Sequence, residues 1–358
     1  MGAVGSLSKR TAARAALAAM VAVLWSCAGA SAAAVPVLMT YITDLDKPAP
    51  QVWVSAIGGS SPIDLGPASS ALISPDGEQV AAISIQKGQT VKASTLWLYS
   101  TSGGPLPGTV VQSPQFMQLL AWSPDSKLIL VSVGASPAQL RVINVTTDQS
   151  RTIATGVIDG ASFAPGTSDQ VVYARAAVNT TRVNIYTTSA SGTHTSQLTN
   201  DGLSEYPLWG PNGIVYSRET LRPKNPYPAL QLWFIGARGG TARRLTDIAV
   251  SPKVEGLTPI AFSADGKHLL ANFVGPQGSD QAEAYAVDLS GPKAAALRNL
   301  TGQSNGSIGD AISADGKTIL LTKGIVDNVA PLSIETIPWA GGKPTPVVAQ
   351  GAYASWDL

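Results

Sequence analysis

The stretch Tyr206-Pro207-Leu208-Trp209-Gly210-Pro211-Asn212-Gly213-Ile214-Val215-Tyr216 places two short apolar segments on either side of a Gly-Pro-Asn-Gly turn. Proline presets the backbone at the first central position of a β-turn, and asparagine and glycine suit the positions that follow. The stretch therefore predicts a strand that ends in an aromatic residue, a tight turn and a second strand.

Versions of this phrase recur from one end of the chain to the other. Their spacing of about 40 to 53 residues is typical of four-stranded propeller blades. A last, incomplete copy is Ala354-Ser355-Trp356-Asp357. The complete copies besides the first are Ile73-Ser74-Pro75-Asp76-Gly77, Trp122-Ser123-Pro124-Asp125-Ser126, Phe163-Ala164-Pro165-Gly166, Phe262-Ser263-Ala264-Asp265-Gly266 and Ile312-Ser313-Ala314-Asp315-Gly316.

The strand pattern predicts how the ring closes. Six complete units run from about Ala68 to Gln350, which leaves one strand, Ala352 to Trp356, at the C-terminus. Three further strands precede the units, at residues 37–42, 51–57 and 62–65. Pairing both chain ends in one blade removes two free sheet edges. We therefore expect an all-β propeller of four-stranded antiparallel blades, with seven blades and six or eight as alternatives.

The repeat resembles that of TolB-type propellers, whose blades carry a proline-x-tryptophan-serine-proline-aspartate-glycine core. The most similar segment runs from Gln197-Leu198-Thr199-Asn200-Asp201-Gly202 through Pro207-Leu208-Trp209. The resemblance extends over nearly all of residues 33–358 and implies the fold. It does not imply one function, because similar repeats occur in TolB, in prolyl oligopeptidase propellers and in oligogalacturonate lyases.

The N-terminus has the pattern of an export signal. Lys9, Arg10 and Arg14 precede an apolar run from Ala15 to Trp25, and Ala30-Ser31-Ala32 matches a small-x-small cleavage site. We expect residues 1–32 to be a signal peptide and residues 33–358 to be one propeller domain, periplasmic or secreted. A lipid anchor on Cys27 is the alternative, and an uncleaved anchor is a third possibility.

Composition excludes several classes of function. The net charge of +1 gives no overall field that would favour nucleic acid. Cys27 is the sole cysteine, so a chain cleaved after Ala32 has neither disulfides nor a catalytic thiolate. We expect a monomer without cofactor and without a membrane span in the mature chain.

Recurrent polar and aromatic residues favour structural roles. The turn aspartates are too dispersed for acid–base catalysis, and they suit turn capping. The repeated tryptophans suit packing between blades. His194 and His268 fall in different blades, so the sequence predicts no metal site and no Ser–His–Asp triad.

Binding candidates lie where loops lead into the inner strands or join the second and third strands. The channel mouth is expected to carry Asp159, Glu205, Tyr206, Asp310 and Tyr353. A proline-rich loop from Glu219 to Ala229 adds Arg222, Lys224 and Tyr227. The leading hypothesis is a non-catalytic exported propeller that binds a protein or an envelope polymer through this face. The alternatives are a carbohydrate- or peptide-cleaving lyase or hydrolase using carboxylates such as Glu205 and Asp310, and a structural module of a larger assembly.

Overall fold

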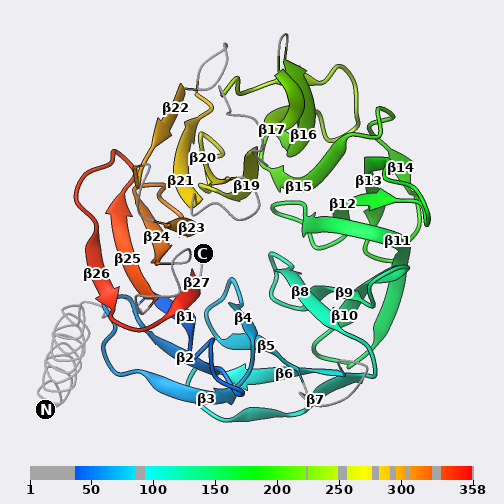
Figure 1. Cartoon of the computed structure of the whole chain (residues 1–358). Coiled ribbons are helices and arrows are strands. Elements are labelled where there is room, and N and C mark those ends of the chain that lie inside the picture. The colour runs from blue at the N-terminus through cyan, green and yellow to red at the C-terminus, as the bar shows by residue number, and fades with distance from the viewer. Residues whose placement is uncertain are drawn as a thin grey trace, which may run out of the picture. The chain divides into compact units, whose positions relative to one another are not determined.

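The structure, a computed structural model, consists of β-strands joined by turns and loops. It describes residues 37–85, 93–222, 225–248, 256–275, 282–290, 296–302, 306–324 and 332–356. The expected signal peptide, residues 1–32, lies outside these ranges. Figure 1 shows the strands arranged in groups around a central axis.

The strands from β4 to β14 form three blades. Strand β11 serves two of them, because its first half pairs with β10 and its second half, after Gly156, pairs with β12. Blade 1 contains β4 (Ser70–Ile73), β5 (Gln79–Ile85), β6 (Ser94–Ser100) and β7 (Pro105–Ser113). Blade 2 contains β8 (Met117–Trp122), β9 (Leu128–Val133), β10 (Ala138–Asn144) and the first half of β11 (Ser150–Phe163). Blade 3 contains the second half of β11, β12 (Gln170–Ala176), β13 (Val183–Ser189) and β14 (Ser196–Gln197).

Three more blades follow in chain order. Blade 4 contains β15 (Ser204–Gly210), β16 (Gly213–Arg222), β17 (Asn225–Ile235) and β18 (Arg243–Arg244). Blade 5 contains β19 (Gly256–Phe262), β20 (His268–Val274), β21 (Ala282–Asp288) and β22 (Ala296–Asn299). Blade 6 contains β23 (Ile308–Ile312), β24 (Thr318–Lys323), β25 (Ser333–Pro338) and β26 (Thr345–Val348).

The last blade is built from both ends of the described chain. Its strand order is β27-β1-β2-β3, in which β27 (Ala352–Trp356) pairs antiparallel with β1 (Leu38–Thr43). Strands β2 (Gln51–Ala56) and β3 (Ile63–Pro67) complete the sheet. The predicted closure by N- and C-terminal strands is therefore present, and the predicted strand limits differ from these by one or two residues.

The hydrophobic core is divided among the interfaces between neighbouring blades. Each buried cluster combines side chains from two adjacent blades. The cluster between blades 3 and 4, for example, contains Val172, Ile185, Ile214 and Tyr216. The core clusters divide the described residues into seven groups, whereas strand pairing links some neighbouring blades and gives five sheets. A ring of such interfaces requires every blade to be in place before the core is complete.

The repeated turn is held by a serine and an aspartate. In blade 5, Ser263 Oγ donates to Asp265 Oδ1 at 2.7 Å and accepts from the His268 N–H at 3.1 Å, and Asp265 Oδ1 also accepts from the Lys267 N–H. Equivalent bonds recur at Ser74–Asp76, Ser123–Asp125 and Ser313–Asp315. These contacts show the turn aspartates in the capping role predicted for them.

The tryptophans have two structural roles. On inner strands, Trp122 Nε1 donates to the Leu72 carbonyl and Trp356 Nε1 donates to the Ile312 carbonyl, at 3.0 and 2.9 Å. Both bonds join one blade to its neighbour. On third strands, Trp53 and Trp97 instead donate to hydroxyl groups on the second strand of their own blade. The predicted packing between blades therefore describes the inner-strand tryptophans, and the third-strand ones also stabilise a single sheet.

Candidate binding face

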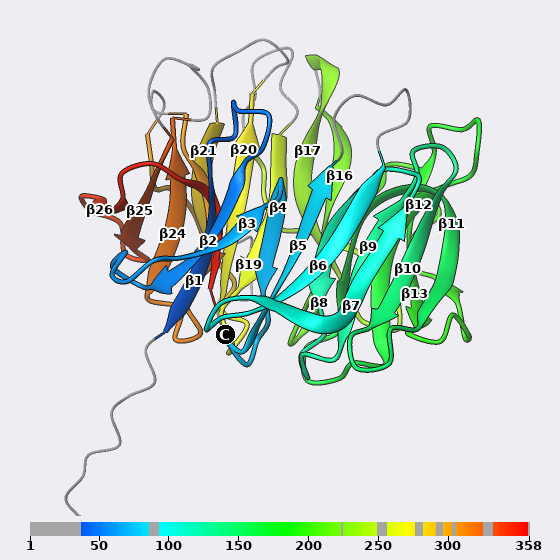
Figure 2. The same ribbon diagram turned by 90° about the horizontal axis from the view of Figure 1, so that it is seen from below.

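One face of the propeller carries the starts of the inner strands and the connections between second and third strands. We call it the loop face. Strands β16 and β17 extend to this side in Figure 2, whereas the C-terminal end lies on the opposite side. The candidate binding residues were predicted from the sequence to lie on this face.

Most inner strands contain an irregularity close to the loop face. The pairing register of β8, β11, β15, β19 and β23 with the second strand shifts by an extra residue, and β27 shows the same shift against β1. Such bulges redirect side chains, and they are over-represented next to functional sites. Four sequence candidates lie in or directly beside these bulges: Asp159, Tyr206, Asp310 and Tyr353.

Two of the bulges hold a tyrosine in a strained backbone conformation. Tyr206 has φ of 50° and Tyr353 has φ of 52°, in the left-handed region. The two residues are 39% and 45% exposed. A non-glycine residue in this region costs about 1–2 kcal/mol. Strain of this kind concentrates at ligand-binding sites.

Gly160, which follows Asp159 on β11, approaches Tyr206 of the adjacent blade. A Cβ placed on Gly160, the residue after Asp159, would lie 3.4 Å from the Tyr206 Cα. Asp159 is partly buried, and this burial raises the pKa of its carboxyl group. Glu205, also partly buried, precedes Tyr206 on β15. The structure therefore brings three of the candidates to the junction of blades 3 and 4.

Asp310 lies at a second junction, between blade 6 and the last blade, which both chain ends form. Its Oδ2 accepts hydrogen bonds from Thr322 Oγ1 and from the Ala354 N–H at 3.3 Å. The N–H of Tyr353 donates to the same Thr322 hydroxyl at 2.8 Å. Burial raises the pKa of Asp310 to about 7, although both hydrogen bonds act to lower it. The carboxylate thus connects β23 and β24 to the C-terminal strand.

The sequence predicted a loop from Glu219 to Ala229, but this prediction is wrong. The segment is the end of an antiparallel hairpin in which Thr220 pairs with Ala229 and Arg222 pairs with Asn225. The segment was predicted as the connection between a second and a third strand, and proline is uncommon in strands, so the continued pairing was not predicted. Arg222 and Tyr227 are on β16 and β17, but their side chains, like the whole of Lys224, lie outside the described residues.

Exposed apolar side chains also collect on the loop face. Phe116 precedes β8 and is 39% exposed, Leu203 precedes β15 and is 40% exposed, and Val178 in the β12–β13 connection is 45% exposed. These three residues were not predicted from the sequence. For Phe116 and Leu203, the available signal was an apolar residue directly before an inner strand, but in sequence such a residue is indistinguishable from a strand residue.

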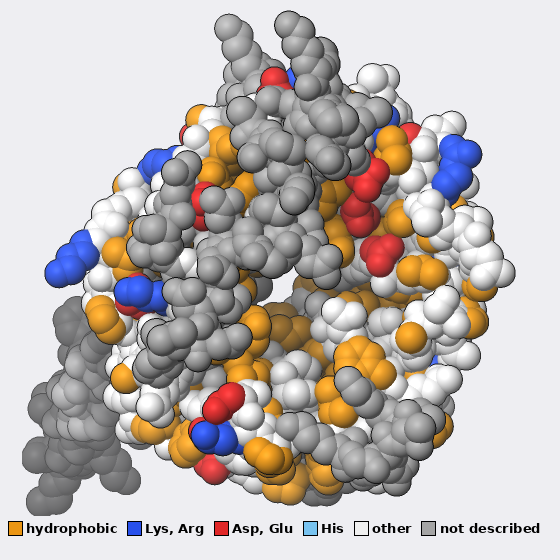
Figure 3. All heavy atoms as spheres, in the orientation of Figure 1, with side chains coloured by type: hydrophobic (Ala, Val, Ile, Leu, Met, Phe, Trp, Pro, Cys, Tyr) orange, Lys and Arg blue, Asp and Glu red, His pale blue; other side chains and the backbone are white. Residues whose placement is uncertain are grey.

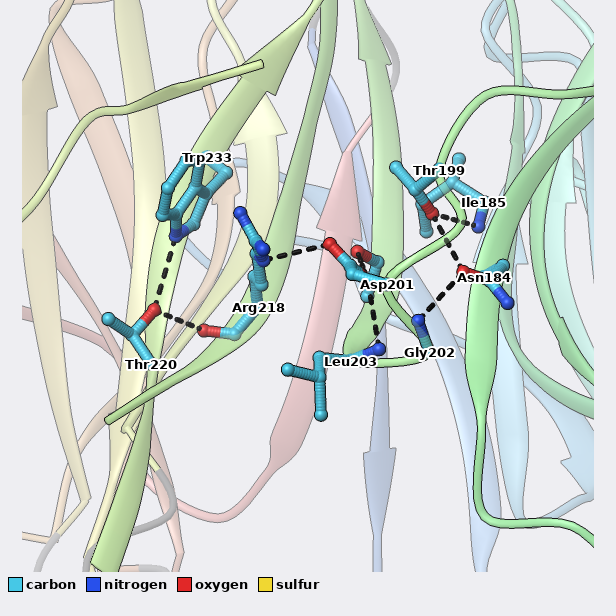
Figure 4. A network of polar contacts seen from close by, with 10 residues as sticks. Asn184, Ile185, Thr199, Asp201, Gly202, Leu203, Arg218, Thr220 and Trp233 are labelled. Carbon is cyan, nitrogen blue, oxygen red and sulfur yellow. Dashed lines mark hydrogen bonds and ion pairs between the residues drawn. The ribbon is translucent and has the colours of Figure 1, made fainter.

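A polar network under this face fixes the junction of blades 3 and 4 (Figure 4). Asp201 forms an ion pair with Arg218 Nε at 2.8 Å and accepts from the Leu203 N–H and Ser204 Oγ. The Arg218 guanidinium lies 4.3 Å from the centroid of the Trp233 ring. This network holds the start of β15, and with it Tyr206, in position.

On the face drawn in Figure 3, acidic side chains gather beside the central opening, in the region of blades 3 and 4. Several lysine and arginine side chains lie toward the outer edge of the same view. The face thus combines exposed aromatic and aliphatic groups with carboxylates near the channel.

Histidine and potential metal-ligating side chains are dispersed among the described residues. No group of three or more His, Cys, Asp or Glu side chains among them is placed to hold a metal ion. His194 is exposed in a turn, where its Nδ1 lies 3.0 Å from Thr193 Oγ1. His268 stacks on Trp339 with ring centroids 4.3 Å apart. The two histidines therefore occupy separate structural settings.

Within the part of the chain that the structure describes, no helix has the length and apolar character needed to cross a membrane.

Comparison with solved structures identifies the architecture. TolB from Acinetobacter baumannii aligns with a TM-score of 0.54 at 15% identity, over 89% of this chain and 66% of that one. The fold is a TolB-like β-propeller. A prolyl endopeptidase aligns with a TM-score of 0.61 at 13% identity, over 87% of this chain and 47% of that one. This chain thus spans just under two thirds of the TolB structure and about half of the endopeptidase.

A further propeller gives a structural contrast. The β-propeller domain of the Trilobed protease from Pyrococcus furiosus aligns with a TM-score of 0.56 at 12% identity, over 78% of this chain and 82% of that one. That domain is described as having an open velcro topology, whereas here β27 pairs with β1. No protein-family model and no curated protein matches the chain.

Proposed function

We propose that this protein is an exported, non-catalytic β-propeller that binds a protein or a cell-envelope polymer through its loop face. The observation that carries the proposal is the presence of two exposed tyrosines, Tyr206 and Tyr353, in strained bulges on channel-lining strands. Backbone strain of this kind concentrates at ligand-binding sites, and an exposed aromatic ring is suited to anchor a partner.

The surroundings of the tyrosines support a binding role. Phe116, Val178 and Leu203 add apolar surface on the same face. Aromatic anchors among polar groups are typical of protein interfaces. Asp159 and Glu205 supply carboxylates beside Tyr206, and they favour a partner with cationic or hydroxyl groups. Solved propellers with this architecture include TolB and peptidases, which is consistent with an extended polymer or polypeptide as partner.

Catalysis by carboxylates is the competing function, and Asp310 is the observation in its favour. A carboxyl group with a pKa of about 7 is suited to acid–base chemistry near neutral pH. Its bonds to Thr322 and Ala354 explain it as a structural group at the closing junction. We therefore favour binding over catalysis.

Site-specific photo-crosslinking in cells tests the proposal. A photoreactive amino acid is placed at Tyr206, Leu203 or Phe116, and at Ile57 as a control. Ile57 follows β2, lies away from the loop face and is similarly exposed, at 36%. We expect the same adduct from all three loop-face positions and none from Ile57. Adducts of equal yield from Ile57, or none from any position, would contradict the proposal.

An activity screen on glycans and peptides runs in parallel with the crosslinking. We expect no turnover. Turnover that is abolished by Glu205→Gln or Asp310→Asn in a folded variant would establish the enzymatic alternative instead.

A further inference from the structure

One position of the third strand can be compared across all blades, and most blades carry an aromatic residue there. It is the third-strand residue that pairs with the fourth residue of the second strand. The pairs are Trp53 with Tyr41, Trp97 with Ala82, Arg141 with Val131, Tyr186 with Tyr173, Trp233 with Tyr216, Tyr285 with Ala271 and Glu335 with Leu321. Blades 2 and 6 therefore lack the aromatic ring that the other blades carry.

The aromatic ring contacts the second-strand residue two positions further on. Arg175 lies over Tyr186 at 4.5 Å, Arg218 lies over Trp233 at 4.3 Å, and the Phe273 and Tyr285 rings are 6.2 Å apart. In blade 6 the same two positions hold Lys323 and Glu335, whose Nζ and Oε1 atoms are 3.1 Å apart. An ion pair has replaced a large ring at this place.

The replacement coincides with an open cleft between blades 5 and 6. Its volume is about 560 Å³, within the range of small-molecule sites. A Cβ on Gly302 or on Gly342, on two of its walls, would meet no atom within 4 Å. The lining residues are Leu300, Thr301, Gly302, Ser307, Leu321, Lys323, Glu335, Gly342, Lys343, Pro344 and Pro346.

The charges of this cleft favour an anion. The side chain of Glu335 is 10% exposed and is compensated by Lys323, which is 46% exposed. An ammonium group has three donors, so Lys323 retains donors for a ligand after its bond to Glu335. Lys343 adds a second positive charge, and the hydroxyl groups of Thr301 and Ser307 are further polar groups in the lining.

We propose that the cleft between blades 5 and 6 binds a small organic anion that carries carboxylate groups. Lys323 and Lys343 bind the carboxylates, and the Leu300, Pro344 and Pro346 surfaces contact the carbon skeleton. The site is separate from the loop-face tyrosines, which belong to other blades, so it does not depend on the function proposed above.

Isothermal titration of the purified protein with citrate at low salt tests the site, with tricarballylate as a second probe. We expect Lys323→Ala and Lys343→Ala each to weaken binding about tenfold or more. Lys267→Ala is the matched control, because Lys267 is an exposed lysine paired to an aspartate in a turn between strands. Binding by this control should equal that of the wild type.

A further variant, which fills the cleft with a large side chain, tests whether the anion binds there. Glu335→Trp restores the residue type of the other blades, and it should fill the cleft and abolish citrate binding while the protein stays folded. Circular dichroism and the melting temperature check the fold of every variant. Undetectable binding to the wild type would overturn the proposal. Binding that survives Lys323→Ala, Lys343→Ala and Glu335→Trp would also overturn it, since the anion would then lie elsewhere.

Discussion

The indole N–H of Trp356 donates a hydrogen bond to the carbonyl oxygen of Ile312 at 2.9 Å. This bond joins the last inner strand to the blade before it, over 44 residues of sequence. Trp122 makes the same contact with Leu72 at the start of the ring, at 3.0 Å. The same hydrogen bond from a tryptophan to a carbonyl group therefore joins neighbouring blades within the chain and at the blade where its two ends meet.

The closing strand should be essential for stability. Deletion of residues 352–358 removes β27, leaves the edge of β1 unpaired and opens the core cluster that contains Met39, Leu320 and Trp356. We expect loss of cooperative unfolding or a large fall in the melting temperature, measured by calorimetry. An equally long deletion within residues 1–32 is the control. A truncated protein that melts like the intact one would show that the ring does not depend on closure.

The hydrogen bond from Trp356 to Ile312 should make a measurable contribution to the free energy of unfolding. Trp356→Phe keeps most of the ring but leaves the buried Ile312 carbonyl without its donor, a loss of about 1–3 kcal/mol. Trp122→Phe is the matched variant, because its bond to Leu72 has nearly the same length. Urea unfolding should give similar losses for both. A negligible effect of either substitution would argue against the bond as a stabilising contact.

Asp310 should make stability depend on pH. Its folded-state pKa of about 7 lies above its ordinary value of 3.8, so the folded protein binds the proton more tightly than the unfolded chain. Stability from this group is therefore present below about pH 4 and falls as the pH rises toward 7. The difference between wild type and Asp310→Asn, measured by urea unfolding from pH 4 to 8, should show this slope. Parallel pH profiles would contradict it.

Asp265 should show the opposite dependence. The hydrogen bond from Ser263 is the largest of the causes that lower the pKa of Asp265 to about 2, and Ser263→Ala should return this pKa toward 3.8. Because the folded pKa is depressed, the stability from Asp265 is present above about pH 4 and lost as the pH falls toward 2. NMR titration of the carboxyl carbon measures the change. Asp315, whose pKa is also about 2, is the internal control and should not move in the Ser263→Ala variant.

Strain at the loop-face tyrosines can be separated from binding. Tyr206→Gly and Tyr353→Gly place a residue that tolerates positive φ at each bulge and remove an exposed ring. We expect the free energy of unfolding to change by no more than about 1 kcal/mol. The relief of backbone strain should offset the larger conformational entropy that glycine gives to the unfolded chain. Crosslinking from the neighbouring Leu203 position should fall at the same time. A strongly destabilised variant would mean that the rings support the fold.

Most of the fold could be predicted from the sequence because propeller blades are local. Each strand pairs with its neighbour in the chain, and the Ser-x-Asp turn of Ser263 and Asp265 is closed by bonds within five residues. Even the joining of the two ends followed from counting strands. The prediction failed at residues 219–229, where prolines occupy a hairpin, since local preference there yields to cross-strand pairing.

Sequence alone determined the repeat, the turn chemistry and the general position of Asp159, Tyr206, Asp310 and Tyr353. Only the tertiary structure decided which residues meet across blades: Gly160 with Tyr206, Asp310 with Ala354, and the residues of the cleft beside Lys323 and Glu335. The physical reason is that contacts within a blade are fixed by strand register. Contacts between blades depend on bulges and on the side chains that fill each interface, and no sequence period specifies these.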